Sequence, residues 1–363
     1  MNYHHWHGFT DGRFGYGSML NGFLNHVPDR IRLDEMASVS VHMGVPFSCK
    51  GWYEGQHRVC FTMWETTVLP PKFVRWLNQY DQILVPCQHN VPVFAAHHPN
   101  VNYVPLGVDR TIWFPKKRKE NKVFKFMAGG SLWERKGIDA VVAAFKRLDL
   151  PDAELHLKMA PHARDIPDDA HGNNIFFHRK WMTMGEQVDF FRSADCWVAP
   201  ARGEGFGLIP LQAISAGVPT IVTASSGQAQ FAHLASSIVK SSPQPCRWGG
   251  KWDEPDISDL VRLMRHHYEN RVGLQVDARE KAVLADEFSW DNAANLLVDA
   301  LPSGSKLDES SNWINPQVLL RAEVSKRTTV EVNGQAHRFE PGRVYEVDEN
   351  IVDILYAGGY LKN

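Results

Sequence analysis

Two successive series of short apolar runs, separated by segments with helical periodicity, constrain the fold more than any other feature of the chain. The expected strands of the first series are Met1–Trp6, Ser38–His42, Arg58–Met63, Gln82–Pro86 and Val101–Leu106. Those of the second series are Val123–Gly130, Glu154–Met159, Ile175–His178, Cys196–Ala199 and Thr220–Thr223. Strands that alternate with helices form parallel sheets covered by helices. The pattern therefore predicts an α/β protein.

Two breaks in this pattern predict the division into domains. The charged stretch Pro115–Lys122 lies between the two series, and the polar stretch Pro302–Asn315 follows the second. We interpret both as linkers, because neither shows a clear strand or helix period. The expected domains span residues 1–120, 121–302 and 316–363. The last helix of the second domain, at 289–301, has Ser289 as its expected cap.

The tail is expected to form a small module of its own. Alternating runs at Thr328–Val332 and Ala336–Phe339 flank the dipeptide Asn333-Gly334, which is a strong signal for a β-hairpin. Asp348 then favours the start of a short helix that ends near Gly358. The predicted module is a β-hairpin with a helix, too short for a large core of its own.

A glycine-bearing loop, His7–Gly17, joins the first expected strand to a helix that Ser18 is expected to cap. Gly12, Gly15 and Gly17 have the spacing G-x-x-G-x-G, which differs from that of a dinucleotide fingerprint. No acidic residue ends the next strand at the distance that a dehydrogenase requires. The loop therefore disfavours a dehydrogenase, and a simple turn is the other interpretation.

Composition narrows the class of protein. The chain has 363 residues, is 44% hydrophobic and has no run of eighteen apolar residues, so no membrane span is expected. Met1–His7 lacks the basic and apolar regions of a secretory signal. The five cysteines form no C-x-x-C pair, which favours reduced thiols in the cytoplasm. The net charge of −2 disfavours a protein that holds nucleic acid mainly through its phosphates.

The segment Val198–Val222 indicates the chemistry most clearly. A β run ends at Pro200, a loop with three glycines follows, and a helix is expected from Leu208 to Gly217. A glycine loop that leads into a helix offers N–H groups and a positive dipole end to an anion. The loop follows a strand, at the edge where open α/β sheets bind ligands. Glu204 in this loop repels phosphate, which favours a ligand that also carries hydroxyls, such as a sugar.

This segment resembles the donor-binding signature of the retaining glycosyltransferases of family 4, whose GT-B fold has two Rossmann-like domains that face each other across a cleft. The resemblance lies in Glu204-Gly-Phe-Gly followed by the expected helix. It implies that Glu204 holds hydroxyls of the donor sugar. It also implies that Gly205, Phe206, Gly207 and Leu208 face the sugar and the diphosphate.

One position departs from the family signature. The family has a second Glu, eight positions after the first, that binds the ribose hydroxyls of the nucleotide, and this chain has Gln212 there. A Gln amide can pair with a hydroxyl, but it brings no charge, and charge-assisted hydrogen bonds are roughly twice as strong as neutral ones. The departure predicts weaker or altered recognition of the ribose.

A second element, Ala128–Gly137, is similar to the strand, loop and Lys-Gly segment of the same family. The resemblance implies that Lys136 neutralises the diphosphate as it leaves. The family often has an Arg several residues before this Lys, where this chain has Ser131. Arg135 is the candidate that substitutes for it.

The first domain contributes further candidates. The loop with Gly15 and Gly17 lies where the family places a glycine loop against the donor phosphates. Glu65 lies among apolar residues in the stretch Met-Trp-Glu-Thr, and a buried carboxylate needs a compensating partner. Glu65 is therefore a candidate for the catalytic region, and His42, at the end of an expected strand, is its alternative.

The resemblance covers about residues 1–302, and it implies that the helix at 289–301 packs back on the first domain. It also implies transfer with retention of configuration. No convincing covalent nucleophile is present, which favours a front-face displacement in which the leaving phosphate takes the acceptor proton. No Asp-x-Asp triplet occurs, so a metal-independent reaction is the hypothesis. No cofactor is expected besides the UDP- or GDP-linked donor.

The sequence leaves several acceptors possible. The tail from residue 327 resembles short modules at the ends of tailed-phage proteins, which suggests a phage-encoded enzyme. A hydroxylated DNA base, a virion protein and an envelope glycan are the candidate acceptors. Two other classes of function also stay open. One is a sugar-nucleotide epimerase or phosphorylase on the same fold. The other is a non-catalytic carbohydrate-binding or structural phage component, which Gln212 and Ser131 favour and Glu204 and Lys136 oppose.

Overall fold

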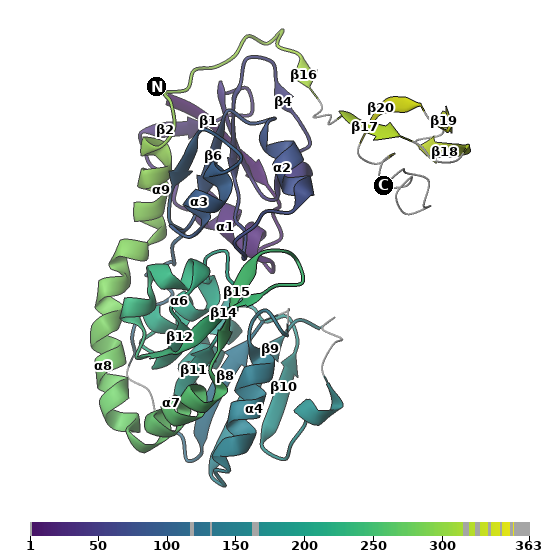
Figure 1. Ribbon diagram of the computed structural model, residues 1–363. Coiled ribbons are helices and arrows are strands. Elements are labelled where there is room, and N and C mark those ends of the chain that lie inside the picture. Colours follow the sequence, from purple (N-terminus) through teal and green to yellow (C-terminus); the bar gives the residue numbers. More distant parts are fainter. Residues whose placement is uncertain are drawn as a thin grey trace. The chain divides into compact units, whose positions relative to one another are not determined.

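The computed structural model describes residues 2–116, 120–130, 133–161, 167–314, 319–323, 327–332, 335–341, 343–348 and 351. The chain divides into two units, one of residues 1–49 with 55–310 and one of residues 50–54 with 311–363. The first unit contains two six-stranded parallel sheets with helices packed on them (Figure 1). The predicted α/β class with two doubly wound sheets is therefore confirmed.

The first sheet has the strand order β2-β1-β3-β5-β6-β7, and every neighbouring pair is parallel. Its strands are β1 (Asn2–Gly8), β2 (Ile31–Leu33), β3 (Val39–Met43), β5 (His57–Phe61), β6 (Gln82–Val85) and β7 (Val101–Tyr103). The helices of this domain are α1 (Gly15–Leu24), α2 (Pro71–Leu77), α3 (Asn90–Ala95) and the short 3₁₀ turn η1 (Pro46–Ser48). The order reverses between β1 and β3, which makes the ends of these two strands the topological switch point.

The second sheet has the order β10-β9-β8-β11-β12-β13, again entirely parallel. Its strands are β8 (Phe124–Gly129), β9 (Ala153–Met159), β10 (Ile175–Arg179), β11 (Cys196–Ala199), β12 (Thr220–Thr223) and β13 (Ser237–Val239). Its helices are α4 (Ile138–Leu148), α5 (Met184–Arg192), α6 (Leu208–Ser215), α7 (Ile257–Glu269) and α8 (Arg271–Leu284), with 3₁₀ turns η2 (Asp168–Ala170), η3 (Ser226–Gln230), η4 (Ala232–Leu234) and η5 (Ala285–Phe288). This order corresponds to 3-2-1-4-5-6, so its switch point lies between β8 and β11.

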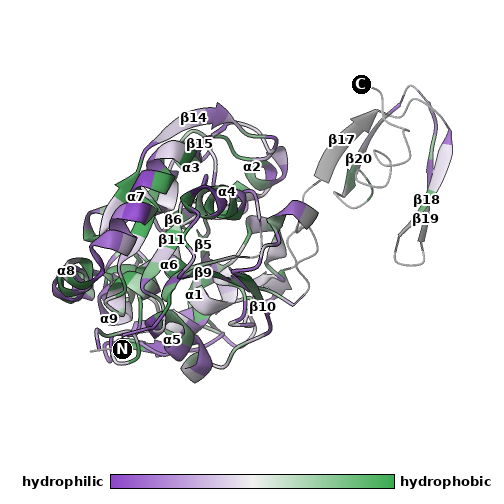
Figure 2. Cartoon of the chain, turned by 90° about the horizontal axis from the view of Figure 1, so that it is seen from below, coloured by the Kyte–Doolittle hydropathy of each residue, from purple (hydrophilic) through white to green (hydrophobic). Residues whose placement is uncertain are grey.

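Local sequence explains why these segments form their elements. Along β9 every second residue, from Ala153 to Met159, is buried, which is the period of a strand that packs one face on a core. Helix α7 carries both hydrophobic and hydrophilic bands, as Figure 2 shows, and Asp256 caps it by accepting hydrogen bonds from two backbone N–H groups of its first turn. An antiparallel hairpin of β14 (Ser241–Pro245) and β15 (Lys251–Pro255), which the sequence analysis did not predict, precedes α7. No helix within the described ranges is long and apolar enough to cross a membrane.

The last helix of the first unit, α9 (Trp290–Asp299), returns to the first domain. Ser289 caps it as predicted, because its hydroxyl accepts a hydrogen bond from the backbone N–H of Asn292 at 3.2 Å. The Trp290 ring lies 5.2 Å from the Phe23 ring of α1, centroid to centroid. In Figure 1, α8 runs beside the second sheet and α9 continues beside the first. The chain therefore crosses back after completing the second domain.

One expectation for the first unit was wrong. Helix α1 begins at Gly15 with Phe14 as its N-cap, so Ser18 lies inside the helix, where its hydroxyl donates to the carbonyl of Gly12 at 2.7 Å. The expected linker Pro302–Asn315 begins with a segment that pairs with the edge of the first domain. Within this segment Gly304 accepts from the N–H of Tyr3, and Lys306 pairs with Asp34 at 2.5 Å. Backbone pairing, which composition does not reveal, fixes this part of the chain.

The described residues of the second unit form three antiparallel strand pairs. Strand β4 (Trp52–Tyr53) pairs with β16 (Trp313–Ile314), β17 (Leu319–Glu323) with β20 (Val344–Asp348), and β18 (Thr328–Val332) with β19 (Gln335–Phe339). The pair β18–β19 confirms the hairpin predicted around Asn333-Gly334. Of the helix predicted to begin at Asp348 and to end near Gly358, the structure describes Asp348, which is the last residue of β20, and Ile351; the other residues lie outside the described ranges.

The contact between α1 and α9 yields a prediction with an internal control. A Cβ on Gly22 would lie 2.2 Å from the Trp290 ring, whereas a Cβ on Gly273 in α8 would meet nothing within 4 Å. We expect Gly22→Ala to lower the free energy of unfolding by about 1–3 kcal/mol, because it overpacks this contact. Gly273→Ala should raise it by about 0.5–1 kcal/mol through helix propensity. Urea unfolding of both variants measures this, and equal shifts would refute the packing of α9 on α1.

Candidate functional site

A cavity of about 560 Å³ lies where the two domains of the first unit meet. Its walls come from segments that follow strands of both sheets. From the first domain these are residues 9–16 after β1, 44–48 after β3 and 63–65 after β5, together with Leu106. From the second they are residues 129–130 and 135–136 at and after the end of β8, 158–160 at the end of β9, Trp181 after β10, and 204–209 after β11, together with Trp197 on β11. Both switch points therefore open onto one cavity.

Glu204 is the buried carboxylate of this cavity, with only 5% of its surface exposed. Its Oε1 accepts a hydrogen bond from Nζ of Lys136 at 2.5 Å, and its Oε2 accepts one from Nη1 of Arg135 at 3.3 Å. The loop is fixed from behind as well, because the backbone N–H of Glu204 donates to the hydroxyl of Ser226 at 2.9 Å. The sequence-predicted residues Glu204, Lys136 and Arg135 thus lie in direct contact.

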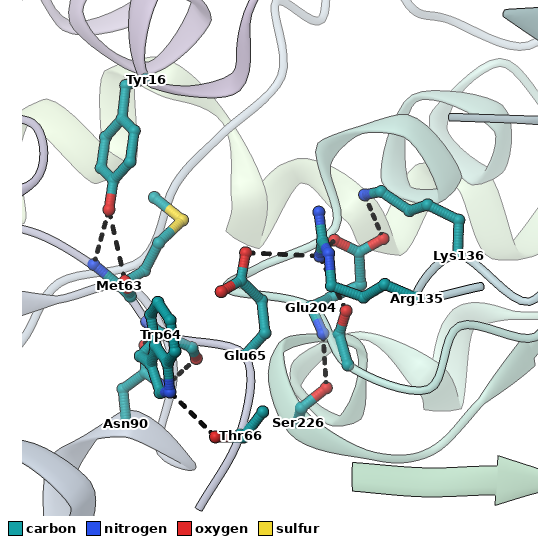
Figure 3. Close-up of polar contacts among 11 residues, drawn as sticks. Tyr16, Met63, Trp64, Glu65, Thr66, Asn90, Arg135, Lys136, Glu204 and Ser226 are labelled. Atoms are coloured by element: carbon teal, nitrogen blue, oxygen red, sulfur yellow. Dashed lines mark hydrogen bonds and ion pairs between the residues drawn. The ribbon is translucent and has the colours of Figure 1, made fainter. Parts of the chain in front are cut away.

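Glu65 of the first domain belongs to the same cluster. Its Oε1 lies 3.4 Å from Nη1 of Arg135, and the same nitrogen donates to the carbonyl of Gly203 at 2.8 Å. Figure 3 shows Glu65 pointing toward Arg135 and Glu204, with Lys136 on the other side of Glu204. Two carboxylates and two cations therefore alternate across the junction of the domains.

The segment that carries Glu65 is held by Asn90, which the sequence analysis did not identify. Asn90 is completely buried. Its side-chain carbonyl accepts from the N–H of Trp64 at 3.0 Å, and its amide donates to the carbonyl of Trp64 at 2.7 Å (Figure 3). One side chain satisfies both backbone groups of the residue before Glu65, so Asn90 is a positioning residue for that carboxylate.

Two glycines allow the loop after β11 to approach the first domain. A Cβ on Gly203 would lie 2.5 Å from the carbonyl oxygen of Glu65, and one on Gly205 would lie 2.4 Å from the sulfur of Met63. Any side chain at these positions would push the two domains apart. The glycines predicted to expose backbone to a ligand therefore also permit close contact between the domains.

Burial and charge act in opposite directions on the paired groups. Burial alone would raise the pKa of Glu204, but the charges of Lys136 and Arg135 outweigh it and hold this pKa below its ordinary value. Burial lowers the pKa of Lys136, although the nearby Glu204 carboxylate opposes this. Arg135, Lys136 and Glu204 therefore lie together, as charged groups, in a buried part of the cavity.

Of the other residues predicted to bind the donor, some line the cavity and some do not. Gly15 lines it at the N-terminal end of α1, and Phe206, Gly207 and Leu208 line it at the N-terminal end of α6. Two helix N-termini therefore face the cavity, each with a positive dipole end. Gly17 does not line the cavity: it is buried against the backbone of Asp11, which leaves no room for a side chain.

Gln212 also lies outside the cavity lining. It is half-buried on α6, and its side-chain carbonyl accepts a hydrogen bond from Gln187 at 3.3 Å. Ser131, the other position that departs from the family pattern, lies outside the described residues. The cavity therefore has Arg135 as the described cation beside Lys136 in the loop after β8.

The structure adds cavity residues that the sequence analysis missed. Lys158 lies at the carboxyl end of β9, where the switch-point rule for α/β sheets would have pointed to it. Trp181 lies beside Phe14, with ring centroids 5.8 Å apart, and the guanidinium of Arg13 stacks over it at 5.2 Å. These contacts join the loop after β1 to the segment after β10, and no local sequence pattern signals them.

Tyr16 is a further missed residue of the cavity. Its hydroxyl lies 3.1 Å from the hydroxyl of Thr62 and 3.3 Å from both the carbonyl and the N–H of Met63. Burial raises the pKa of Tyr16 above its ordinary value, so the hydroxyl stays protonated. Tyr16 and Asn90 together fix the segment that leads to Glu65.

One group of residues in the described part of the chain has the composition of a metal site: His7, His42 and Cys49. His42, the alternative to Glu65, is buried in this group and does not line the cavity, although Gly44 and Ser48 beside it do. The structure therefore separates the two candidates into different clusters.

The Glu204 cluster yields a pH-dependent prediction. Glu204→Gln should lower the free energy of unfolding at pH 7 by about 3 kcal/mol, because buried Lys136 loses its carboxylate partner and Arg135 loses one of its two. The Glu204 pKa lies below its ordinary value of 4.5 in the folded chain, so the stabilisation is complete above that pH and disappears as pH falls through the lowered pKa. The difference between wild type and variant should therefore narrow in acid.

Urea unfolding at a series of pH values measures this difference. Glu280→Gln, at an exposed position on α8, is the control and should change stability little at any pH. A gap that widens toward acid, or no gap at pH 7, would contradict the pairing of Glu204 with the two cations.

Similar proteins place this geometry in a family. A family described as family 4 glycosyltransferases in conflict systems matches residues 91–297, more than half of the chain. The D-inositol 3-phosphate glycosyltransferase of Paenarthrobacter aurescens is 24% identical over 225 residues, which cover 57% of this chain and 52% of that protein. The mannosylfructose-phosphate synthase of Agrobacterium fabrum is 21% identical over 248 residues, which cover 61% and 52%. The chain thus spans about half the length of these relatives.

Solved structures agree on the fold. The Anabaena protein Alr3699/HepE, determined in complex with UDP and glucose, superposes with a TM-score of 0.62 at 10% identity, over 82% of this chain and 98% of that one. The sucrose-phosphate synthase of Thermosynechococcus elongatus superposes with a TM-score of 0.54 at 14% identity, over 72% of each chain. The chain therefore has the GT-B fold and belongs to the family 4 glycosyltransferases of conflict systems.

Proposed function

We propose that the protein is a glycosyltransferase that moves a sugar from a nucleoside diphosphate donor to an acceptor hydroxyl with retention of configuration. The observation that carries the proposal is the position of Glu204, buried between Lys136 and Arg135 in a cavity onto which both switch points open. A carboxylate suits sugar hydroxyls, whereas the two cations suit a diphosphate.

The charge of the cavity lining supports a diphosphate ligand. Among the residues that the structure describes, the charged ones of the lining are Arg13, Arg135, Lys136, Lys158, Glu65 and Glu204. These four cations and two carboxylates have a formal charge of +2, although the whole chain carries −2. The two helix N-termini add positive potential at the same place. The local excess equals in magnitude the charge of the diphosphate in a nucleotide sugar.

The chemical step that we propose is a front-face displacement. The bond between the anomeric carbon and the leaving phosphate oxygen breaks, while a bond to the acceptor oxygen forms on the same face. The acceptor proton passes to the leaving phosphate oxygen. Lys136 and Arg135 stabilise the charge that develops on the diphosphate, and Glu204 orients the sugar through its hydroxyls. Glu65 is a further catalytic candidate, facing Arg135 from the acceptor-side domain.

Donor hydrolysis is the experiment that tests this proposal. We expect one donor from a panel of UDP- and GDP-linked sugars to release its nucleotide slowly without acceptor. The rate should be the same with added Mg²⁺, with Mn²⁺ and with free divalent ions chelated by EDTA, because side-chain cations and dipoles take the place of a metal. A rate that rises with Mn²⁺ would reject metal independence. An isomerised nucleotide sugar among the products would instead indicate an epimerase.

Variants of the two paired residues test the assignment of the site. Glu204→Ala and Lys136→Ala should each lower turnover by about 100-fold or more, because each removes one group that stabilises the transition state. Lys180→Ala, on an exposed residue of the same domain that pairs with Glu186, is the matched control and should keep normal turnover. Near-normal rates in both cavity variants would reject the site.

One observation favours a second candidate, a sugar-nucleotide-binding protein without transferase activity. Gln212, at the position where the family binds the ribose, lies outside the cavity lining and bonds to Gln187. In that case a donor should bind in calorimetry, with no nucleotide released at any enzyme concentration. Binding followed by release supports the transferase.

The acceptor and the place of action complete the proposal. We propose a hydroxyl on a DNA base, a protein or a glycan as acceptor, and a phage-encoded enzyme that works in the host cytoplasm. The cysteines are consistent with a reducing compartment, since no disulfide forms among the residues that the structure describes. Mass analysis of a hydroxymethyl-pyrimidine duplex, incubated with the active donor, distinguishes the DNA acceptor from the others.

A further inference from the structure

His7, His42 and Cys49 form a compact group at the switch point of the first sheet. His7 lies near the carboxyl end of β1 and His42 near that of β3, and the two are direct partners in the parallel register. Cys49 follows the 3₁₀ turn η1. One potential ligand atom from each residue lies within 4.8 Å of the other two. The end of β1 and the segment from His42 to Cys49 thus place two imidazoles and a thiol around one point.

The hydrogen bonds of both imidazoles are compatible with metal binding. In metal sites a histidine binds the ion through one ring nitrogen and donates a hydrogen bond from the other. Nε2 of His42 lies 3.2 Å from the carbonyl of Val45 and 3.0 Å from the hydroxyl of Ser48, and Nε2 of His7 lies 3.0 Å from the hydroxyl of Ser40. Each ring therefore has one nitrogen engaged with oxygen.

The remaining nitrogen of His42 gives the independent observation. His42 is only 3% exposed, and its Nδ1 is buried without a hydrogen-bond partner among the described residues. A buried polar atom with no partner is uncommon in folded proteins and calls for an explanation such as a bound ion. Nδ1 of His42 is therefore the atom that lacks a ligand.

The chemistry of the three groups selects the ion. Imidazole and thiolate together are typical ligands of Zn²⁺, whereas Mg²⁺ and Ca²⁺ prefer oxygen. Zinc bonds of about 2.0–2.3 Å place tetrahedral ligand atoms roughly 3.3–3.8 Å apart, so three atoms that now lie within 4.8 Å of one another need to close by roughly 1.5 Å or less. Gly44, Val45 and Ser48, which surround His42, line the large cavity. With three protein ligands, a tetrahedral zinc site keeps its fourth position for water.

We propose that His7, His42 and Cys49 bind one Zn²⁺ ion beneath the cavity wall formed by residues 44–48. The Cys49 thiol loses its proton to solvent as the Zn–S bond forms. The ion links β1, β3 and the turn η1, and so fixes one wall of the cavity. The site rests on the first domain alone and does not depend on the proposed transferase, which uses other residues and no metal.

Zinc binding to the full-length, untagged chain tests the proposal. After metal is removed by a chelator, Zn²⁺ alone is added, its stoichiometry is measured by native mass spectrometry and its affinity by competition with a chromogenic chelator. We expect one ion per chain. Cys49→Ser and His42→Gln should each weaken binding by more than about 100-fold, since loss of an outer partner alone costs 10–100-fold.

Cys246→Ser is the matched control. Cys246 is buried to the same degree as Cys49, with 8% of its surface exposed, but it lies near the β14–β15 hairpin. This variant should bind zinc like the wild type. Co²⁺ in place of Zn²⁺ should give a thiolate-to-metal charge-transfer band in the wild type and in Cys246→Ser, and none in Cys49→Ser.

Stability measurements keep the test decisive. Zn²⁺ should raise the melting temperature of the wild type and of Cys246→Ser, but not that of Cys49→Ser. If Cys49→Ser does not fold, His7→Gln at the half-buried position replaces it. A wild-type chain that binds no zinc, or ligand variants that bind it as tightly as the wild type, would overturn the proposal.

Discussion

The guanidinium of Arg135 is the interaction on which the site depends. Its Nη1 contacts the carbonyl of Gly203 and the carboxylates of Glu204 and Glu65 at 2.8, 3.3 and 3.4 Å. Arg135 is 9% exposed, and a buried cation is stable only when its charge and its hydrogen bonds are compensated. These three partners come from both domains, so compensating one charge also aligns the two halves of the cavity. Lys136, the next residue, is thereby brought to the other oxygen of Glu204.

Topology explains why such groups meet at all. In a doubly wound sheet the chain leaves adjacent strands in opposite directions at the switch point, and the loops that follow form a crevice. In the second sheet the loops after β8 and β11 carry Lys136 and Glu204. In the first sheet the same geometry brings together the ends of β1 and β3, with His7 and His42. One architectural rule thus brings together charged groups in one domain and a cluster of imidazole and thiol groups in the other.

The sequence predicted those features of the site that lie in continuous segments of the chain. The strand, glycine loop and helix around Glu204, and the Lys-Gly element with Lys136, are continuous segments whose residue types indicate anion binding by themselves. Lys158 could have been inferred from its place at a strand end. Asn90, Trp181 and Tyr16 could not, because their roles depend on contacts with segments far away in the chain. Ser18 was misassigned as a cap for the same reason: its hydroxyl bonds to the preceding loop, which sequence spacing does not show.

The pairing of Glu204 bears on how a site of the proposed kind works. Without a ligand, Lys136 and Arg135 already have carboxylate partners, so a diphosphate gains only the difference between its own contacts and the ion pairs that it replaces. This small gain limits how tightly the site binds the donor before the reaction begins. Arg135, which contacts Gly203 and Glu65, nevertheless stays within reach of the proposed leaving group, and the attraction of both cations grows as charge develops on the diphosphate. A donor sugar whose hydroxyls occupy Glu204 releases Lys136 for this task, which couples recognition of the sugar to stabilisation of the leaving group.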